Sequence, residues 1–153
     1  MDKIIVRQLR PEDYGQFRNI VRETEPLFGS QIGDSGFYDM VMDLCKKKNT
    51  FCTVNEHDNL TGAIIINRET HWIEWLAVKK RYQGKEYGRE LLEKAIKELK
   101  GNDIFVRTFS EGIPEGIPAR KLYDSFRFKH FVSAEKNPAG YDTEVLKRGR
   151  EAL

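Results

Sequence analysis

The chain has 153 residues, 39% hydrophobic and 33% charged, so it can bury one ordinary core and has no need of a second domain. Its 26 basic and 24 acidic side chains nearly balance, which argues against a nucleic-acid-binding protein. No apolar run is long enough to span a bilayer, and the first residues lack the apolar stretch and cleavage site of a signal peptide. We therefore expect a single domain over residues 1–153, located in the cytoplasm, with neither a membrane nor a nucleic acid as partner.

The cysteines and histidines predict neither a disulfide framework nor a metal centre. The two cysteines, Cys45 and Cys52, are too few for a disulfide-stabilised scaffold or a zinc site. The histidines stand in three separate segments, at His57, His71 and His130, without the spacing of metal ligands. We expect no bound metal.

The first half of the chain predicts a strand, two helices and three further strands. A strand over residues 4–9 precedes a helix that begins near Pro11 and should end near Glu23, because proline and glycine follow in residues 25–30. An apolar stripe at helical spacing over residues 37–45 predicts the second helix. Three β-rich runs separated by polar turns then predict an antiparallel meander: residues 51–54, 60–66 and 71–78.

The second half predicts one strand-helix-strand crossover and a closing hairpin. Apolar residues from Leu91 to Leu99 share one helical face, and two Glu-Lys pairs four residues apart lie on the other face. A strand over residues 104–109 follows, and such a crossover makes its two strands parallel neighbours. The remaining elements are a loop, a short helix and two hairpin strands, over residues 110–118, 119–126, 128–134 and 141–146. The expected fold class is α/β (α+β), with a mixed, mostly antiparallel sheet flanked by helices.

The run from Val78 to Leu92 predicts a site for a phosphorylated ligand. A short strand stops, a turn with glycine follows, and an amphipathic helix begins, so unpaired N–H groups and the positive end of the helix dipole face the turn. Four cationic side chains add charge there: Lys79, Lys80, Arg81 and Lys85. The turn is neither a P-loop nor a dinucleotide fingerprint. A plain connection with a solvated basic face is the alternative interpretation.

This turn resembles the acetyl-CoA-binding motif of the GNAT superfamily of N-acetyltransferases. That motif reads Arg/Gln, any, any, Gly, any, Gly/Ala after a strand that ends in valine. Gln83 fills its first position and Gly88 its last, and Val78 is the strand-end valine. Glu86 stands where the family has its middle glycine, which would put a carboxylate near the expected pyrophosphate.

A second stretch strengthens the resemblance. After its parallel strand the family has a helix with Ala, any, any, Leu-Tyr, followed by Gly-Phe. This chain has Ala119, Leu122 and Tyr123 at the matching spacing, and Arg127 replaces the glycine before Phe128. The order of the predicted elements is also similar to the GNAT fold from end to end.

The resemblance implies a reaction in which an amine attacks the thioester of acetyl-CoA directly and the CoA thiolate leaves. The backbone at the end of the third meander strand would bind the pantetheine arm, through Leu76, Ala77 and Val78. Amides of the turn would hold the pyrophosphate, whatever their side chains, through Gln83, Gly84, Lys85, Glu86, Tyr87 and Gly88. The cosubstrate is therefore expected to be acetyl-CoA, and the partner an amine on a small molecule or a peptide.

Two catalytic residues follow from the same resemblance. Tyr123 matches the tyrosine that acts as general acid toward the thiolate, although it could equally be a core residue of its helix. Glu74 is the candidate base, because a carboxylate beside Trp72 and Trp75 could have a raised pKa. Strand alternation equally allows Glu74 to face solvent or to pair with a lysine.

The acceptor cleft is the least determined part. Family members form it from the first two helices, the meander and the last hairpin, which makes five residues candidate lining groups: Glu23, Glu25, Phe28, Tyr38 and Trp72. Small amines, antibiotics, amino acids, protein N-termini and lysines all remain open as acceptors. The resemblance also admits a homodimer, which is common in the family. The alternative function is a non-catalytic CoA-binding or regulatory module, which the changes at Glu86 and Arg127 make reasonable.

Overall fold

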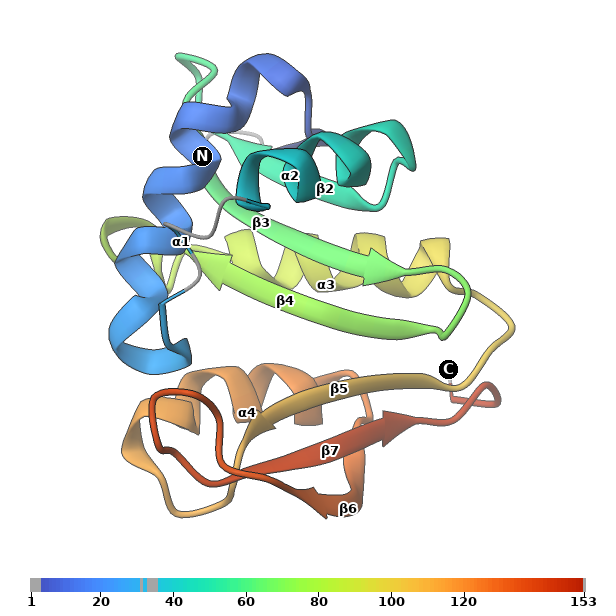
Figure 1. Ribbon diagram of the computed structural model, residues 1–153. Helices are drawn as coiled ribbons and strands as arrows, with labels where there is room; N and C mark the ends of the chain where they lie inside the picture. The colour runs from blue at the N-terminus through green and yellow to red at the C-terminus, as the bar shows by residue number, and fades with distance from the viewer. Residues whose placement is uncertain (1–3, 31, 33–35, 153) are drawn as a thin grey trace.

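The computed structural model describes residues 4–30, 32 and 36–152. They form a sheet of seven strands with helices on both faces (Figure 1). The strands, α-helices and 3-10 helices (η) follow in the order β1 (Ile5–Gln8), η1 (Pro11–Asp13), α1 (Tyr14–Phe28), α2 (Phe37–Lys46), β2 (Thr50–Val54), β3 (Leu60–Asn67), β4 (Trp72–Val78), η2 (Lys80–Tyr82), α3 (Tyr87–Glu98), β5 (Ile104–Phe109), η3 (Pro114–Gly116), α4 (Ile117–Ser125), β6 (Lys129–Ala134) and β7 (Thr143–Arg148).

The sheet is mixed and mostly antiparallel, as predicted. Its strand order is β1-β2-β3-β4-β5-β7-β6, and β4 and β5 form its one parallel pair among the described residues. These two strands pair only at their first residues, Trp72 with Phe105 and Ile73 with Val106. Beyond that point they diverge, and Figure 1 shows the gap widening toward the end of β4. The sheet is thus two half-sheets joined at one end.

Two apolar cores lie on opposite faces of the sheet. On one face α1 and α2 cover the first half-sheet, and Phe17 and Val41 are fully buried there. On the other face α3 and α4 cover both half-sheets, and Leu91 and Leu92 of α3 are fully buried. Burial of an aliphatic or aromatic side chain stabilises a fold by about 1.5–3 kcal/mol. Both helical layers are therefore held firmly around the gap between β4 and β5.

Two helices extend past the prolines that were expected to bound them. α1 continues through Pro26 to Phe28 instead of ending near Glu23. The proline lies in the last turn, where its missing N–H costs a single helical hydrogen bond. α4 begins at Ile117, two residues earlier than expected, because Pro118 fits the first turn of a helix. Even so, none of the helices formed by the described residues is long and apolar enough to cross a membrane.

The ion pairs on α3 differ from the predicted ones. Lys94 pairs with Glu98 at 3.3 Å, in the next turn of the helix. Arg68, from the turn between β3 and β4, contacts the same carboxylate at 2.8 Å. Two cations therefore share Glu98, and neither of the predicted Glu-Lys pairs forms in the described part of the chain.

Candidate active site

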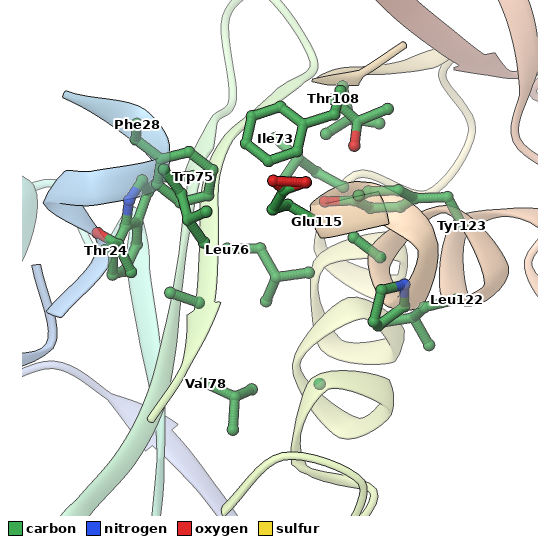
Figure 2. A pocket seen from close by; sticks show the side chains of 18 of the residues that line it. Thr24, Phe28, Ile73, Trp75, Leu76, Val78, Thr108, Glu115, Leu122 and Tyr123 are labelled. Atoms are coloured by element: carbon green, nitrogen blue, oxygen red, sulfur yellow. The ribbon is translucent and has the colours of Figure 1, made fainter. Parts of the chain in front are cut away.

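The gap between β4 and β5 opens into a cleft of about 850 Å³ (Figure 2). Its walls come from α1, β4, the turn before α3, β5, η3 and α4, and from residues 137 and 143. Nine of the eleven predicted site residues line it: Glu74, Leu76, Ala77, Val78, Gln83, Gly84, Glu86, Gly88 and Tyr123. The other two, Lys85 and Tyr87, are not among its lining residues. Segments far apart in the sequence are thus brought together around one cavity.

A β-bulge in β4 shapes one wall of this cleft. Trp75 and Ile73 pair with consecutive residues of β3, so Glu74 between them has no partner across the ladder. The extra residue reverses the alternation of side chains. Ile73 packs in the core under α3, and beyond the bulge Leu76 and Val78 pack against that same core. The bulge therefore bends β4 away from β5, and among the described residues the edge of β4 that faces β5 has no strand partner beyond Ile73.

The turn before α3 has the free donors that an anion needs. Within the described part of the chain, no partner is found for the N–H groups of residues 84–89, and no side chain caps α3. The side-chain amide of Gln83 donates to the carbonyl of Val78 at 3.1 Å and fastens the turn to the end of β4. Unpaired N–H groups at the positive end of a helix dipole attract phosphate. The turn therefore has free backbone donors where the sequence predicts the anion cradle, and phosphate binding there stays a prediction.

Both positions that depart from the family motifs keep a glycine-like backbone. Glu86 has φ 74° and Arg127 has φ 70°, in the left-handed region that residues other than glycine rarely adopt. The cost is about 1–2 kcal/mol for each residue. The side chain of Glu86 turns to Arg89, whose Nε lies 3.1 Å from its carboxylate. The substitutions thus change the side chains without changing the course of the chain.

Arg127 ends α4 with a pair of backbone hydrogen bonds. Its own N–H donates to the carbonyl of Asp124 at 2.9 Å, and the N–H of Phe128 donates to the carbonyl of Tyr123 at 3.1 Å. Together with the edge contact between the Tyr123 and Phe128 rings, this is a Schellman motif. The helix end therefore holds the backbone of Tyr123 in place.

Tyr123 combines burial with an open hydroxyl. The residue is 5% exposed, and Figure 2 shows its hydroxyl pointing into the cleft. Among the described residues this hydroxyl has no hydrogen-bond partner. Burial raises the pKa of the phenol above its ordinary value, so the group stays protonated at neutral pH. It can donate a proton or a hydrogen bond into the cleft.

Glu74 lies at the bulge with its carboxylate toward solvent. The residue is exposed, and its Oε1 accepts a hydrogen bond from Nδ2 of Asn67 at 3.1 Å. The apolar setting between two tryptophans that the sequence suggested is therefore not found. Neither Glu74 nor any other described acidic residue belongs to a group of three or more His, Cys, Asp or Glu side chains that could hold a metal ion.

Of the five predicted acceptor-lining residues, only Phe28 lines the cleft. The carboxylate of Glu23 instead accepts a hydrogen bond from the N–H of Lys80 at 2.5 Å and ties α1 to η2. Tyr38 and Trp72 pack against other aromatic rings outside the cavity. Four of the five candidate lining residues therefore lie outside this cleft, Glu25 among them.

The sequence analysis did not single out three residues near Phe28 at this end of the cleft: Glu115, Phe109 and Tyr141. Glu115 of η3 lines the cleft. Phe109, at the end of β5, lies 5.9 Å from Phe28 and 4.8 Å from Tyr141 between ring centroids. The glycine- and proline-rich loop after β5 could have indicated them, because loops at strand ends often carry functional residues.

The loop between β6 and β7 closes the open end of the gap. Nδ2 of Asn137 donates to the carbonyl of Leu27, near the end of α1, at 2.8 Å. Gly29 approaches Pro138 so closely that a Cβ there would lie 2.6 Å from the proline Cβ. In Figure 1 the end of α1 meets this loop across the gap between β4 and β5. Strand pairing bounds the gap at one end, and this contact bounds it at the other.

The structure thus has a half-sheet on either side of a ligand-sized cleft and, within the described residues, unpaired N–H groups at a helix start in its wall. A sequence model of the acetyltransferase (GNAT) family matches residues 14–128. That match covers most of the chain, and the chain therefore belongs to the GNAT acetyltransferase family. A comparison with curated protein sequences found no match.

Solved structures share this fold at low sequence identity. The acetyltransferase yncA from Salmonella typhimurium, solved with acetyl-CoA, is 14% identical with a TM-score of 0.73, and the alignment covers 99% of this chain and 96% of that one. Arabidopsis thaliana NAA60, in complex with a bisubstrate analogue, is 14% identical with a TM-score of 0.76, over 99% and 100%. An N-acetyltransferase from Staphylococcus aureus Mu50 is 15% identical with a TM-score of 0.75, over 97% and 99%.

Proposed function

We propose that this protein is an N-acetyltransferase that transfers the acetyl group of acetyl-CoA to an amine by direct attack. The observation that carries the proposal is the convergence of three features in one cleft: the free edge of β4, the unpaired N–H groups before α3 and the buried phenol of Tyr123. Each feature meets one need of the reaction, which must bind an extended arm, hold a pyrophosphate and protonate a leaving sulfur.

The cleft fits acetyl-CoA in its size and in its free N–H donors. Its volume of about 850 Å³ lies within the range of ligand pockets, about 300–1,000 Å³. The N–H groups of residues 84–89 would hold the pyrophosphate, and the edge of β4 at residues 76–78 would bind the pantetheine arm. Acetyl-CoA supplies an activated thioester, from which the acetyl group passes to the amine and the thiolate leaves. The Salmonella neighbour was solved with acetyl-CoA, which supports the same assignment.

The state of the cysteines supports direct attack rather than an acyl-enzyme. Neither Cys45 nor Cys52 is among the residues that line the cleft. Burial raises the pKa of the Cys52 thiol to about 12 and also raises that of Cys45. A thiol that stays protonated is a poor nucleophile. Tyr123 would then give its proton to the departing sulfur, and a carboxylate in the cleft would take one from the amine.

The test is a calorimetric titration of the purified protein with acetyl-CoA, followed in the same sample by thiol release against a panel of amines. The panel holds alkylamines, amino acids, and peptides with a free N-terminus or a lysine. We expect binding with release that depends on the amine. Binding without release would favour the non-catalytic module, and absence of binding would contradict both functions.

Replacing Glu86 with glycine should stabilise the fold and leave acetyl-CoA affinity nearly unchanged. The free energy of unfolding should rise by about 0.5–1 kcal/mol, because the lost left-handed strain exceeds the entropy that glycine adds to the unfolded chain. Acetyl-CoA affinity should change less than about threefold, because the carboxylate is exposed and paired with Arg89. Thermal unfolding and calorimetry measure the two effects.

Arg127→Gly is the matched control, because it relieves the same strain at a residue that does not line the cleft. It should give a similar gain in stability and no change in affinity. A large gain in affinity for Glu86→Gly alone would mean that the native carboxylate opposes phosphate binding.

A further inference from the structure

We propose that Glu115 is the carboxylate that binds the ammonium group of the acceptor and removes its proton. This inference rests on the proposed acetyl transfer and identifies the group that prepares the acceptor for attack. It differs from the prediction for Glu74, and it implies that the acceptor enters as a primary alkylammonium ion.

The position of Glu115 inside the cleft is the first argument. Figure 2 shows its carboxylate pointing into the same space as the hydroxyl of Tyr123. A general base must lie within reach of the reacting amine, on the same side of the cavity as the acid that serves the leaving group. The carboxylate of Glu74 is instead bonded to Asn67 at the surface.

The packing of η3 keeps Glu115 over the cavity. The next residue, Gly116, is buried against β5, and a Cβ there would lie 2.7 Å from the Cβ of Phe109. Only a glycine lets the backbone of η3 approach the Phe109 side chain this closely. Pro114 at the start of η3 restricts the preceding turn further. Glu115 is therefore presented by a short rigid element rather than by a loose loop.

The surroundings of Glu115 suit a cation. Phe28 and Phe109 line the cleft with their ring centroids 5.9 Å apart, and the ring of Tyr141 stacks on Phe109 at 4.8 Å. Aromatic faces attract an ammonium ion, more strongly the further it is desolvated. A carboxylate beside aromatic rings recognises the charge of an alkylammonium ion and leaves room for its carbon chain.

Of the titratable groups around the cleft, Tyr141 interacts directly with Glu115, through its charge and through a side-chain hydrogen bond. Those facing it from α4, β5, β4 and the β6–β7 loop are Lys121, Tyr123, Arg107, Glu74 and Tyr141. The guanidinium of Arg107 donates hydrogen bonds to Oγ1 of Thr143, at 2.8 Å, and to the carbonyl of Glu135. The negative charge of Glu115 raises the pKa of the Tyr141 phenol, which places the two side chains close together.

The protons balance in this scheme. Glu115 takes one proton from the ammonium, and the free amine forms the new C–N bond as the C–S bond breaks. On becoming an amide the nitrogen loses a second proton to water, while Tyr123 gives its proton to the sulfur and regains one from water. Glu115 then returns its own proton to the solvent. One proton is released to solvent for each acetyl group transferred.

The test compares two glutamates in identical local sequence. Residues 111–118 repeat the tetrapeptide Glu-Gly-Ile-Pro, and only its second glutamate lines the cleft. With n-butylamine as acceptor, Glu115→Gln should lower kcat/KM about 100-fold at pH 7. The deficit should shrink as the pH approaches the pKa of the amine, because an uncharged amine needs no base. Glu111→Gln should keep wild-type rates at every pH.

A second measurement needs no turnover. Calorimetric titration of n-butylammonium chloride into CoA-saturated protein should show about tenfold weaker binding for Glu115→Gln than for wild type or Glu111→Gln. Equal ammonium binding, or a loss of rate by one constant factor at all pH values, would overturn the inference. A loss of rate on the acidic side of the pH profile that occurs in Glu74→Gln and not in Glu115→Gln would also overturn it. A wild-type protein that binds the ammonium through Glu115 yet acetylates nothing would instead reject the proposed function.

Discussion

Tyr123→Phe should lower the turnover number about 100-fold while acetyl-CoA affinity stays within about twofold. The substitution removes only the hydroxyl that points into the cleft, and the ring keeps its packing against Phe128. The free energy of unfolding should hardly change, because in the described structure that hydroxyl bonds to no protein group. Burial raises the pKa of the phenol. Ionisation of Tyr123 should therefore not reduce turnover at any pH below the ordinary phenol pKa of about 10.

Tyr14→Phe is the control for this experiment. Tyr14 is a partly buried tyrosine of α1 that packs against Phe37 and does not line the cleft. Its variant should turn over like the wild type. Steady-state kinetics with saturating acetyl-CoA measure the turnover number, and calorimetry measures acetyl-CoA affinity. Unchanged turnover in Tyr123→Phe would leave Tyr123 as a core residue and remove its catalytic assignment.

Glu144→Gln should lower the free energy of unfolding by about 2 kcal/mol at pH 7, the largest stability effect we expect from a single charge. Glu144 of β7 is 7% exposed and accepts hydrogen bonds from Arg120 of α4 and from Nδ1 of His130, the latter at 2.5 Å. Glutamine leaves the guanidinium without its counter-charge. Because Arg120 lies one turn before Tyr123, the looser α4 should also reduce turnover.

The difference in free energy of unfolding between wild type and Glu144→Gln should depend on pH. Burial alone would raise the pKa of Glu144, but Arg120 and His130 outweigh it and hold the pKa below its ordinary value of 4.5. The stabilisation is therefore complete above that value and is lost as the pH falls through the lowered pKa. Wild type and Glu144→Gln should converge in acid, as chemical denaturation at several pH values would reveal. An equal difference at all pH values would contradict this account.

Asp142→Asn is the matched control in the same hairpin. Asp142 pairs with Lys136 at 2.7 Å, but both side chains are about two-thirds exposed, at 64% and 66%. An exposed pair contributes less than about 1 kcal/mol, so this variant should stay close to wild type. A loss as large as that of Glu144→Gln would mean that hairpin charge in general, rather than the buried pair, sets stability.

The strand and helix pattern could be predicted because it depends on local periodicity. Alternation and β-branched residues indicated the meander, and the crossover from the third meander strand through α3 indicated the parallel pair. The two family motifs located the anion cradle and Tyr123 in one cavity. Each of these depends on residues near one another in sequence.

The errors arose where tertiary contacts override local signals. The bulge at Glu74 depends on how β3 pairs with β4, and no local pattern in β4 reveals it. Glu115 lies at the cleft in η3, whose Gly116 packs against Phe109, a contact between a short 3-10 helix and a strand. Pro26 suggested a helix end that burial of the α1 face overrides. The end of the cleft near Phe109 was therefore predicted less well than the end near the start of α3.

The bond between Asn137 and Leu27 has a consequence for the shape of an acceptor. With strand pairing at the opposite end, it turns the gap between β4 and β5 into a window framed on all sides. In the proposed acetyl transfer, the attacking nitrogen would have to reach the thioester through this frame. We therefore expect an unbranched alkylamine to be a better acceptor than one branched at the carbon beside the nitrogen.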